Sequence, residues 1–127
     1  AIYIGGVFSY YNDVVRVHVA KLLPTGALDM TFETGSGTNG NIYTIAPPDA
    51  AGGIVIGGAF NNYNGFPARR IARLDRTTGA IDPSFTPIGT MGFNGTVREV
   101  ALGADGKYYA GGDFSSFNNQ LDVAWPD

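Results

Sequence analysis

The chain has no cysteine, only one histidine and few charged residues, and each shortage removes a class of function. Without cysteine, its 127 residues can form neither a disulfide nor a thiolate metal site. Charged residues make up only 15% of the sequence and the net charge is −3, so the charge does not favour nucleic acid or an anionic membrane as a partner. No apolar run approaches the roughly 20 residues that would span a bilayer.

Glycine, aromatic and β-branched residues are abundant instead. The sequence contains 19 glycines, 13% aromatic residues and 44% hydrophobic residues, which argues against disorder and indicates many tight turns between aromatic-rich strands. No stretch combines an apolar period of 3.6 residues with helix caps. The composition therefore predicts an all-β chain, and its length allows one domain with a modest core.

A repeat of about fifty residues runs through the chain. Gly5-Gly6-Val7-Phe8 recurs as Gly57-Gly58-Ala59-Phe60 and as Gly111-Gly112-Asp113-Phe114, at offsets of 52 and 54 residues. Val19-Ala20-Lys21-Leu22 recurs as Ile71-Ala72-Arg73-Leu74. Since the matched segments follow one order and the slips fall in loops, the repeat predicts equivalent folded units.

Each period contains four short strand-like segments, which is the size of one blade of a β-propeller. We expect blade repeats at residues 2–53 and 54–107 and a partial repeat at 108–127. The Gly-Gly pair is expected where neighbouring backbones or sheets approach closely. The aromatic residue two positions later is expected to fill the space between blades (Phe8, Phe60, Phe114).

The segments of this repeat resemble those of the delta-60 repeat β-propeller family. They are Val97-Arg98-Glu99-Val100-Ala101, the run 105–114, Phe60-Asn61-Asn62-Tyr63-Asn64-Gly65, Ile71-Ala72-Arg73-Leu74 and Ile81-Asp82-Pro83-Ser84-Phe85. The resemblance covers residues 2–120. The chain departs from the pattern at 49–53, where the family has a plain Asp-Gly-Lys turn, and at Asp13, which stands where the second repeat has Gly65.

The resemblance implies a fold more firmly than a function. Family members occur among bacterial secreted and surface proteins and among bacteriophage virion proteins, mostly without an assigned activity. A closed propeller needs about four to eight blades, whereas this sequence holds about two and a half repeats. Three arrangements stay open: a piece of a longer protein, closure by self-association, or stacking against other proteins in an assembly.

Several motifs were weighed as sites of chemistry. The run 35–40 fits the dinucleotide fingerprint G-x-G-x-x-G, but that motif requires a following helix, and here a strand-like run and Pro47-Pro48 follow. We expect a loop there. His18, the only histidine, is expected to be a surface or inter-blade residue, because acid–base or metal chemistry would need partners that the pattern does not supply.

The acidic and basic positions favour structural roles. Asp29 and Asp82 occupy equivalent positions before Thr31 and Ser84, a pattern typical of turn capping. Asp105-Gly106 is predicted to form a hairpin turn. The basic group Arg69, Arg70, Arg73 and Arg76 is expected to form solvated or inter-blade ion pairs, with Glu99 and Asp75 available as partners.

Exposed Tyr and Asn side chains on repeated loops suit glycan or protein recognition. The repeat therefore gives six candidate contact residues: Tyr11, Asn12, Tyr63, Asn64, Phe117 and Asn118. The alternative interpretation is that each Asn caps a turn and each aromatic ring packs against the next blade, and this is favoured because the positions belong to the repeat itself.

The sequence predicts a non-enzymatic structural or adhesive module of propeller blades, extracellular, on a bacterial surface or in a phage virion as a tail or fibre component. It predicts no cofactor and no metal. The expected partners are other subunits or further blades of the same protein, and a surface glycan is a second candidate. The alternative is a set of blades from a larger propeller enzyme or ligand-binding protein whose site lies outside this chain.

Overall fold

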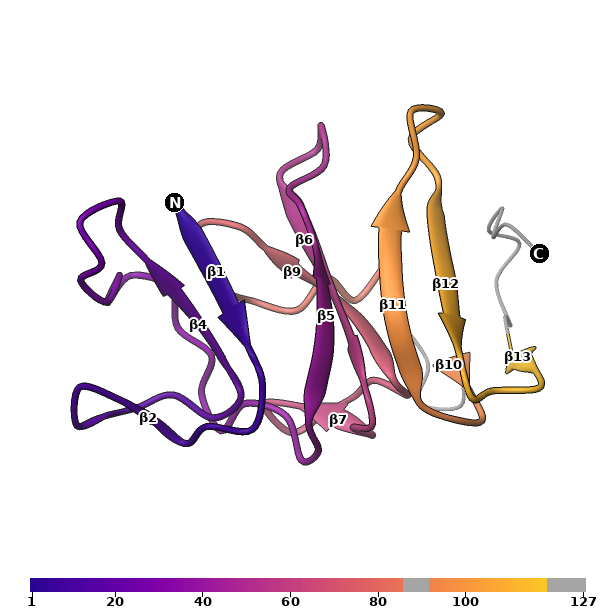
Figure 1. Cartoon of the computed structure of the whole chain (residues 1–127), viewed down its shortest axis with the longest axis horizontal. Coiled ribbons are helices and arrows are strands. Elements are labelled where there is room, and N and C mark those ends of the chain that lie inside the picture. Colours follow the sequence, from indigo (N-terminus) through magenta and orange to yellow (C-terminus); the bar gives the residue numbers. More distant parts are fainter. Residues whose placement is uncertain (86–91, 119–127) are drawn as a thin grey trace.

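The computed structural model describes residues 1–85 and 92–118, with only the backbone of Phe117 and Asn118, and these residues form strands and turns without a helix. Figure 1 shows three small sheets side by side, which we name blades 1, 2 and 3 in chain order. The predicted all-β, antiparallel blade architecture is confirmed. No helix in the described ranges has the length and apolar character to cross a membrane.

Blade 2 is the most complete of the three sheets. Its strands are ordered β5-β6-β9, all antiparallel. A fourth position is occupied by Ile81, which forms a single bridge to Leu74. The bounds are β5 (Ile42–Ala46), β6 (Gly53–Gly58) and β9 (Ile71–Asp75).

Blades 1 and 3 contain parts of the same pattern. Blade 1 pairs β1 (Ile2–Gly5) with β4 (Val19–Leu22) and adds a bridge between Leu22 and Leu28. Blade 3 pairs β11 (Val97–Leu102) with β12 (Tyr108–Gly112). In blade 2 the strand β5 comes from the predicted repeat 2–53 and β6 and β9 come from 54–107. The sequence period and the structural blade are therefore offset by one strand.

In blades 1 and 2 a short hairpin follows the Gly-Gly strand, which is β1 in blade 1 and β6 in blade 2. The first hairpin consists of β2 (Tyr10–Tyr11) and β3 (Val14–Val15), and the second consists of β7 (Asn62–Tyr63) and β8 (Phe66–Pro67). After blade 2, β10 (Gly92–Phe93) pairs with β13 (Phe117–Asn118). Both hairpins β2–β3 and β7–β8 lie on one side of the molecule, opposite the loops that join β5 to β6 and β11 to β12 (Figure 1).

The apolar core lies between the blades rather than within one sheet. Along the fully buried strand β6, Ile54 and Ile56 belong to a cluster shared with blade 1, whereas Val55 belongs to a cluster shared with blade 3. This alternation follows from the two-residue period of a strand whose faces are both covered. Phe60 is fully buried in the first cluster and Phe114 packs against the second, as the repeat predicts.

The Gly-Gly pair is confirmed as the point of close approach, and each of the two glycines leaves room for a different neighbour. A Cβ on Gly57 would lie 2.7 Å from Val97 Cγ1 of the next blade. A Cβ on Gly58 would lie 2.1 Å from the backbone oxygen of Asn41 in its own blade. At Gly111, where the described residues supply no next blade, a Cβ would meet nothing within 4 Å.

The first strands of blades 2 and 3, β5 and β11, carry matching irregularities. The register of β5 against β6 shifts between Ile42 and Thr44, and that of β11 against β12 shifts between Val97 and Glu99. The extra residues are Tyr43 and Arg98, and the Arg98 guanidinium lies 5.5 Å from the centre of the Tyr43 ring. A β-bulge increases the local twist of a strand, so bulges at the same repeat position twist β5 and β11 in the same way.

Candidate functional site

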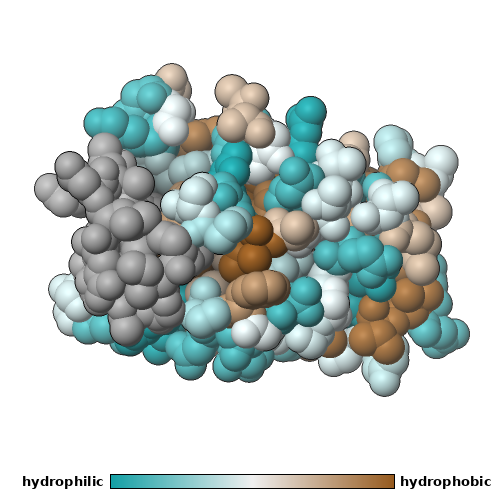
Figure 2. Space-filling view, turned by 180° about the vertical axis from the view of Figure 1, so that it is seen from behind, coloured by the Kyte–Doolittle hydropathy of each residue, from teal (hydrophilic) through white to brown (hydrophobic). Residues whose placement is uncertain are grey.

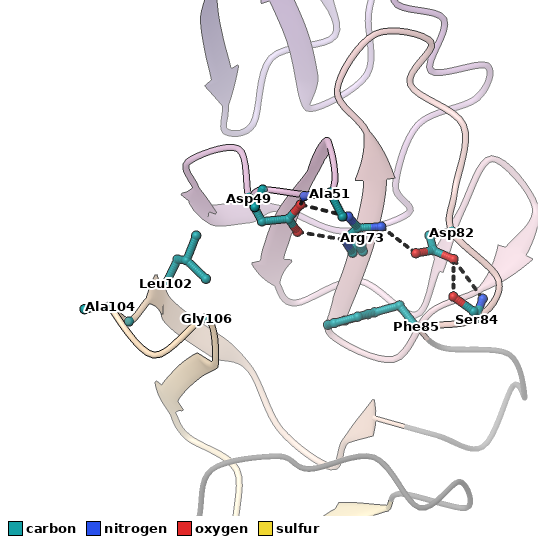
Figure 3. A pocket seen from close by; sticks show the side chains of 11 residues that line it. Asp49, Ala51, Arg73, Asp82, Ser84, Phe85, Leu102, Ala104 and Gly106 are labelled. Atoms are coloured by element: carbon teal, nitrogen blue, oxygen red, sulfur yellow. Dashed lines mark hydrogen bonds and ion pairs between the residues drawn. The ribbon is translucent and has the colours of Figure 1, made fainter.

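A cleft of about 570 Å³ opens between blades 2 and 3 and is lined by the linked charged side chains Asp49, Arg73 and Asp82 (Figure 3). Blade 2 lines one side with the loop before β6, the strand β9 and the segment that follows it. The hairpin β11–β12 lines the other side. The lining residues are Asp49, Ala50, Ala51, Arg73, Asp82, Ser84, Phe85, Leu102, Gly103, Ala104 and Gly106.

Asp49 is positioned by its own loop, by Arg73 of its own blade and by Tyr108 of blade 3. Its Oδ1 accepts backbone N–H bonds from Ala51 (3.0 Å) and Gly53 (2.9 Å), so the carboxylate closes the turn before β6. Arg73 donates two further bonds, from Nε to Oδ2 at 2.9 Å and from Nη2 to Oδ1 at 2.8 Å. The Tyr108 hydroxyl of blade 3 donates to Oδ2 of the same carboxylate. Two parallel bonds between a guanidinium and a carboxylate fix the relative orientation of the two groups as well as their distance.

Arg73 links Asp49 to a second carboxylate. Its Nη1 donates to Asp82 Oδ2 at 2.6 Å, while Asp82 Oδ1 accepts the backbone N–H (2.9 Å) and the hydroxyl (2.6 Å) of Ser84. Figure 3 shows this chain of contacts running along the blade 2 side of the cleft from Asp49 to Ser84. The side chains of Arg73 and Asp49 are 16% and 13% exposed, so the pair is largely shielded from water.

The charges of this cluster shift the pKa values away from the neutral range. The bonds from Arg73 lower the pKa of Asp49 against the opposing effect of burial, and they raise the pKa of Arg73 in turn. Burial opposes ionisation of Asp82, but the bonds from Ser84 and Arg73 outweigh it and lower its pKa. Burial and the bond to Asp49 raise the pKa of Tyr108. All four groups therefore keep one protonation state around neutral pH.

These contacts favour a structural linkage over catalysis. A general acid or base needs a pKa near the working pH, and none of the four groups has one. The cluster carries two carboxylates and one guanidinium, which leaves one net negative charge and disfavours a free anion as ligand. What the arrangement does is join the loop before β6, the strand β9 and the strand β12 across the blade boundary.

The two predicted tyrosine contacts have the same hydrogen bond in different surroundings. Tyr63 donates from its hydroxyl to the backbone oxygen of Gly79 at 2.6 Å, and Tyr11 does the same to Gly26 at 2.5 Å. Tyr63 is only 1% exposed and lies in the core between blades 1 and 2, which leaves no ring surface for a ligand. Tyr11 is half-buried, because no sheet of the described residues lies on that side of blade 1.

The predicted asparagine contacts occupy turns. Asn12 and Asn64 have positive φ values of 47° and 48° in the two hairpins and are exposed. The Asn64 Oδ1 accepts the backbone N–H of Ser36 at 3.1 Å, which ties the hairpin to the loop between blades. Phe117 and Asn118 pair through their backbones in β13, and their side chains lie outside the described residues. Ligand contact by the other five residues is not tested by the structure and stays a prediction, whereas the buried ring of Tyr63 fits the alternative interpretation of packing between blades.

The fold explains the other candidate motifs, the glycine-rich run 35–40 and His18. The glycine-rich run 35–40 forms a loop followed by the strand β5, as predicted. His18 is part-buried, with Nδ1 3.0 Å from both the carbonyl oxygen and the hydroxyl of Thr38. Among residues 1–85 and 92–118, no three His, Cys, Asp or Glu side chains gather as a metal-ion site would require.

The predicted charge partners are right in part. Asp29 and Asp82 cap turns as expected, with Asp29 Oδ1 accepting the Thr31 N–H at 3.0 Å. The expectation that Asp75 and Glu99 neutralise the arginines is wrong for Arg73, whose partners are Asp49 and Asp82. Asp75 instead caps its own turn by accepting the N–H groups of Thr77 and Thr78. Asp75 lies two residues from Arg73 on the same strand face, but its Oδ1 is occupied by the N–H groups of its own turn, whereas the fold brings Asp49 and Asp82 within hydrogen-bond distance of the guanidinium.

Asp49 and Tyr108 are the residues of this cluster that sequence reasoning missed. The available signal was a departure from the repeat: Asp49 lies in the segment 49–53 that interrupts the family's turn. A second missed role belongs to Asn39 and Asn94. Their Oδ1 atoms accept backbone N–H bonds from the residues after the repeated Phe, at 61–62 and 115–116.

Comparison with known families agrees with this blade pattern. The family described as "domain of unknown function (DUF5122) beta-propeller" matches residues 2–32, 52–85 and 103–124, which together make up more than half of the chain. The chain belongs to this β-propeller family. The matched segments include β1, β6, β9 and β12, the strands on which the inter-blade core is built.

Membership in the DUF5122 family establishes the propeller repeat and assigns no activity. The narrower resemblance to delta-60 repeat propellers stays a prediction. No curated protein matched the chain, and no solved structure matched it. The function must therefore be argued from the blades and their contacts.

Proposed function

We propose that this chain is a non-enzymatic structural module of DUF5122 blades that acts through contact with other protein subunits or further blades of the same protein. A surface glycan is a second candidate partner. The resemblance to bacterial surface and phage virion proteins supports an extracellular, cell-surface or virion setting, with a tail, fibre or adhesive role.

The outer face of blade 1 is the observation that carries this proposal. Ile2 is 45% exposed, whereas its counterpart Ile54 is fully buried against blade 1. Tyr11 is likewise less buried than Tyr63. Apolar side chains also gather at the end of blade 1 that carries the hairpin β2–β3 (Figure 2, lower right). Exposed apolar surface of this kind marks interaction sites, because burying it releases about 25 cal/mol per Å².

A test of this proposal measures the native mass of the chain over a range of concentrations. We expect wild type to form a discrete species of higher mass and Ile2→Asp to shift it towards the monomer. Phe66→Asp is the control, because Phe66 is 55% exposed on the strand β8 of the blade 2 hairpin rather than on blade 1. A monomer at all concentrations that also binds no glycan on an array would contradict the proposal.

The alternative function, blades of a larger propeller enzyme or ligand-binding protein, has less support in the described residues. The cleft between blades 2 and 3 is the observation in its favour, since about 570 Å³ lies within the usual range of ligand sites. Saturable binding of a small molecule in this cleft, with loss on Ala104→Trp, would favour the alternative.

A further inference from the structure

At the boundary of blades 1 and 2, a turn of blade 2 packs on blade 1. This turn, residues 75–79, joins the third strand of the blade to its fourth position. The backbone oxygen of Arg76 accepts bonds from Lys21 Nζ (2.8 Å) and from the Tyr3 hydroxyl (2.9 Å) of blade 1. The Glu33 N–H donates to the backbone oxygen of Thr78 at 2.9 Å.

The corresponding position on blade 2 is the cleft. Counting along the repeat, Lys21 corresponds to Arg73, Asp29 to Asp82 and Phe32 to Phe85. These three blade 2 residues line the cleft. The cleft therefore lies on blade 2 where the turn 75–79 lies on blade 1.

Beside the cleft, the strand β12 has one edge that no described strand pairs with. In blade 2 the strand β6 pairs on both edges, with β5 and β9. Its counterpart β12 pairs with β11, and the described part of the chain places no strand on its other edge. An unpaired edge presents a row of backbone N–H and C=O groups that bind another strand. A hairpin with a third strand, a turn and a fourth position would fit both features at once.

The chemistry of the cleft fits a backbone carbonyl. A guanidinium has five N–H donors, and the described contacts of Arg73 use three of them, on Asp49 and Asp82. The Tyr108 hydroxyl also interacts with this guanidinium, and a donor left by these contacts suits an uncharged acceptor, because the carboxylates already outnumber the guanidinium. On blade 1 the Lys21 ammonium binds this kind of acceptor, the oxygen of Arg76.

We propose that the cleft between blades 2 and 3 is a receptor for the turn of a partner β-hairpin of the repeat's own type. The hairpin's first strand adds to the edge of β12 that no described strand of the chain pairs with, and a turn carbonyl reaches Arg73. This inference rests on the proposed contact function and names the partner for one of its surfaces. The pattern expected of the partner is that of residues 71–82, Ile-Ala-Arg-Leu followed by a glycine turn and Ile-Asp.

The test uses a synthetic peptide of residues 69–85 added to the intact chain. We expect saturable one-to-one binding and slower hydrogen exchange of the β12 amides, with no loss of protection in β6. A scrambled peptide of the same composition is expected not to bind. Exchange that protects β12 while exposing β6 would mean replacement of the chain's own hairpin, and would contradict the proposal.

A variant in the cleft separates this site from other surfaces. Ala104 lines the cleft on the exposed loop between β11 and β12, so Ala104→Trp fills the entrance without altering the core. We expect it to weaken peptide binding at least tenfold. The control Thr25→Trp places the same ring on an exposed turn of blade 1 and should leave binding unchanged.

Equal binding by both tryptophan variants, no binding at all, or displacement of the peptide by simple sugars would overturn the proposal. Such a result would leave the proposed function standing, because the Ile2→Asp experiment probes the opposite end of the molecule.

Discussion

At the residue scale, the second glycine of the pairs Gly57-Gly58 and Gly111-Gly112 is required by neighbouring backbone rather than by side chains. The nearest atom to a Cβ on Gly58 would be the carbonyl oxygen of Asn41, at 2.1 Å. Gly112 repeats this contact with the oxygen of Thr96, also at 2.1 Å. A carbonyl held in a strand cannot rotate away as a side chain can, so glycine at these positions allows the two strands to pair.

Gly58→Ala is expected to lower the free energy of unfolding by about 1–3 kcal/mol, the usual cost of overpacking a filled site. Gly6→Ala is the control at the equivalent position of the first repeat, because the nearest atom to a Cβ on Gly6 would be a Phe8 ring carbon at 3.7 Å. We expect that variant to stay within about 0.5 kcal/mol of wild type. Urea unfolding followed by circular dichroism measures both, and equal losses would show that the steric explanation is wrong.

At the scale of the element, the two hairpins differ by one residue in an otherwise shared turn. Asn12 and Asp13 have φ values of 47° and 68°, and Asn64 and Gly65 have 48° and 80°. Two successive positive φ values define a type I′ turn, whose preferred pair is Asn-Gly. The first hairpin therefore holds Asp13 in a conformation that glycine adopts more easily.

Exchanging these residues should move stability in opposite directions. Asp13→Gly is expected to raise the free energy of unfolding by about 0.5 kcal/mol, since relief of the backbone exceeds the extra freedom of the unfolded chain. Gly65→Asp should lower it by a similar amount. No atom lies within 4 Å of a Cβ on Gly65, so packing does not contribute. Thermal unfolding of both variants is the measurement, and changes of the same sign would contradict the turn assignment.

At the scale of the whole molecule, the Asp49 cluster couples blade 3 to blade 2. Its carboxylate accepts from Arg73 of its own blade and from Tyr108 of the next, and its pKa in the folded chain is lowered chiefly by Arg73. A lowered folded pKa contributes stability that is complete above the unfolded pKa, about 3.9, and is lost as the pH falls further. The coupling is therefore expected to be constant at neutral pH and to weaken below about pH 4.

Asp49→Asn should flatten this acid dependence and lower the free energy of unfolding at pH 7 by about 1.5–3 kcal/mol, the usual value of hydrogen bonds to a charged group. Asp113→Asn is the control, because its ion pair with Arg98 is more than half exposed and water screens such pairs, so they contribute little to stability. Urea unfolding at pH 7, 5, 3.5 and 2.5 measures both. A wild-type acid slope that survives in Asp49→Asn would assign the effect to other carboxylates.

The sequence by itself determined the repeat, the strand character and the function of the Gly-Gly pair. These follow from local chemistry repeated at a fixed spacing: β-branched and aromatic residues form strands, and glycine allows close approach at Gly57 and Gly58. The burial of Phe60 and the turn capping by Asp29 and Asp82 could be predicted for the same reason.

Only the tertiary structure decided which residues meet across a blade boundary. Arg73 bonds to Asp49 and Asp82 rather than to Asp75 two residues along its own strand, and Tyr63 is buried while its repeat partner Tyr11 is only half-buried. The physical reason is that a residue's surroundings here depend on the neighbouring sheet. Identical repeat positions become core or surface according to whether a blade covers them, and no pattern within one repeat contains that information.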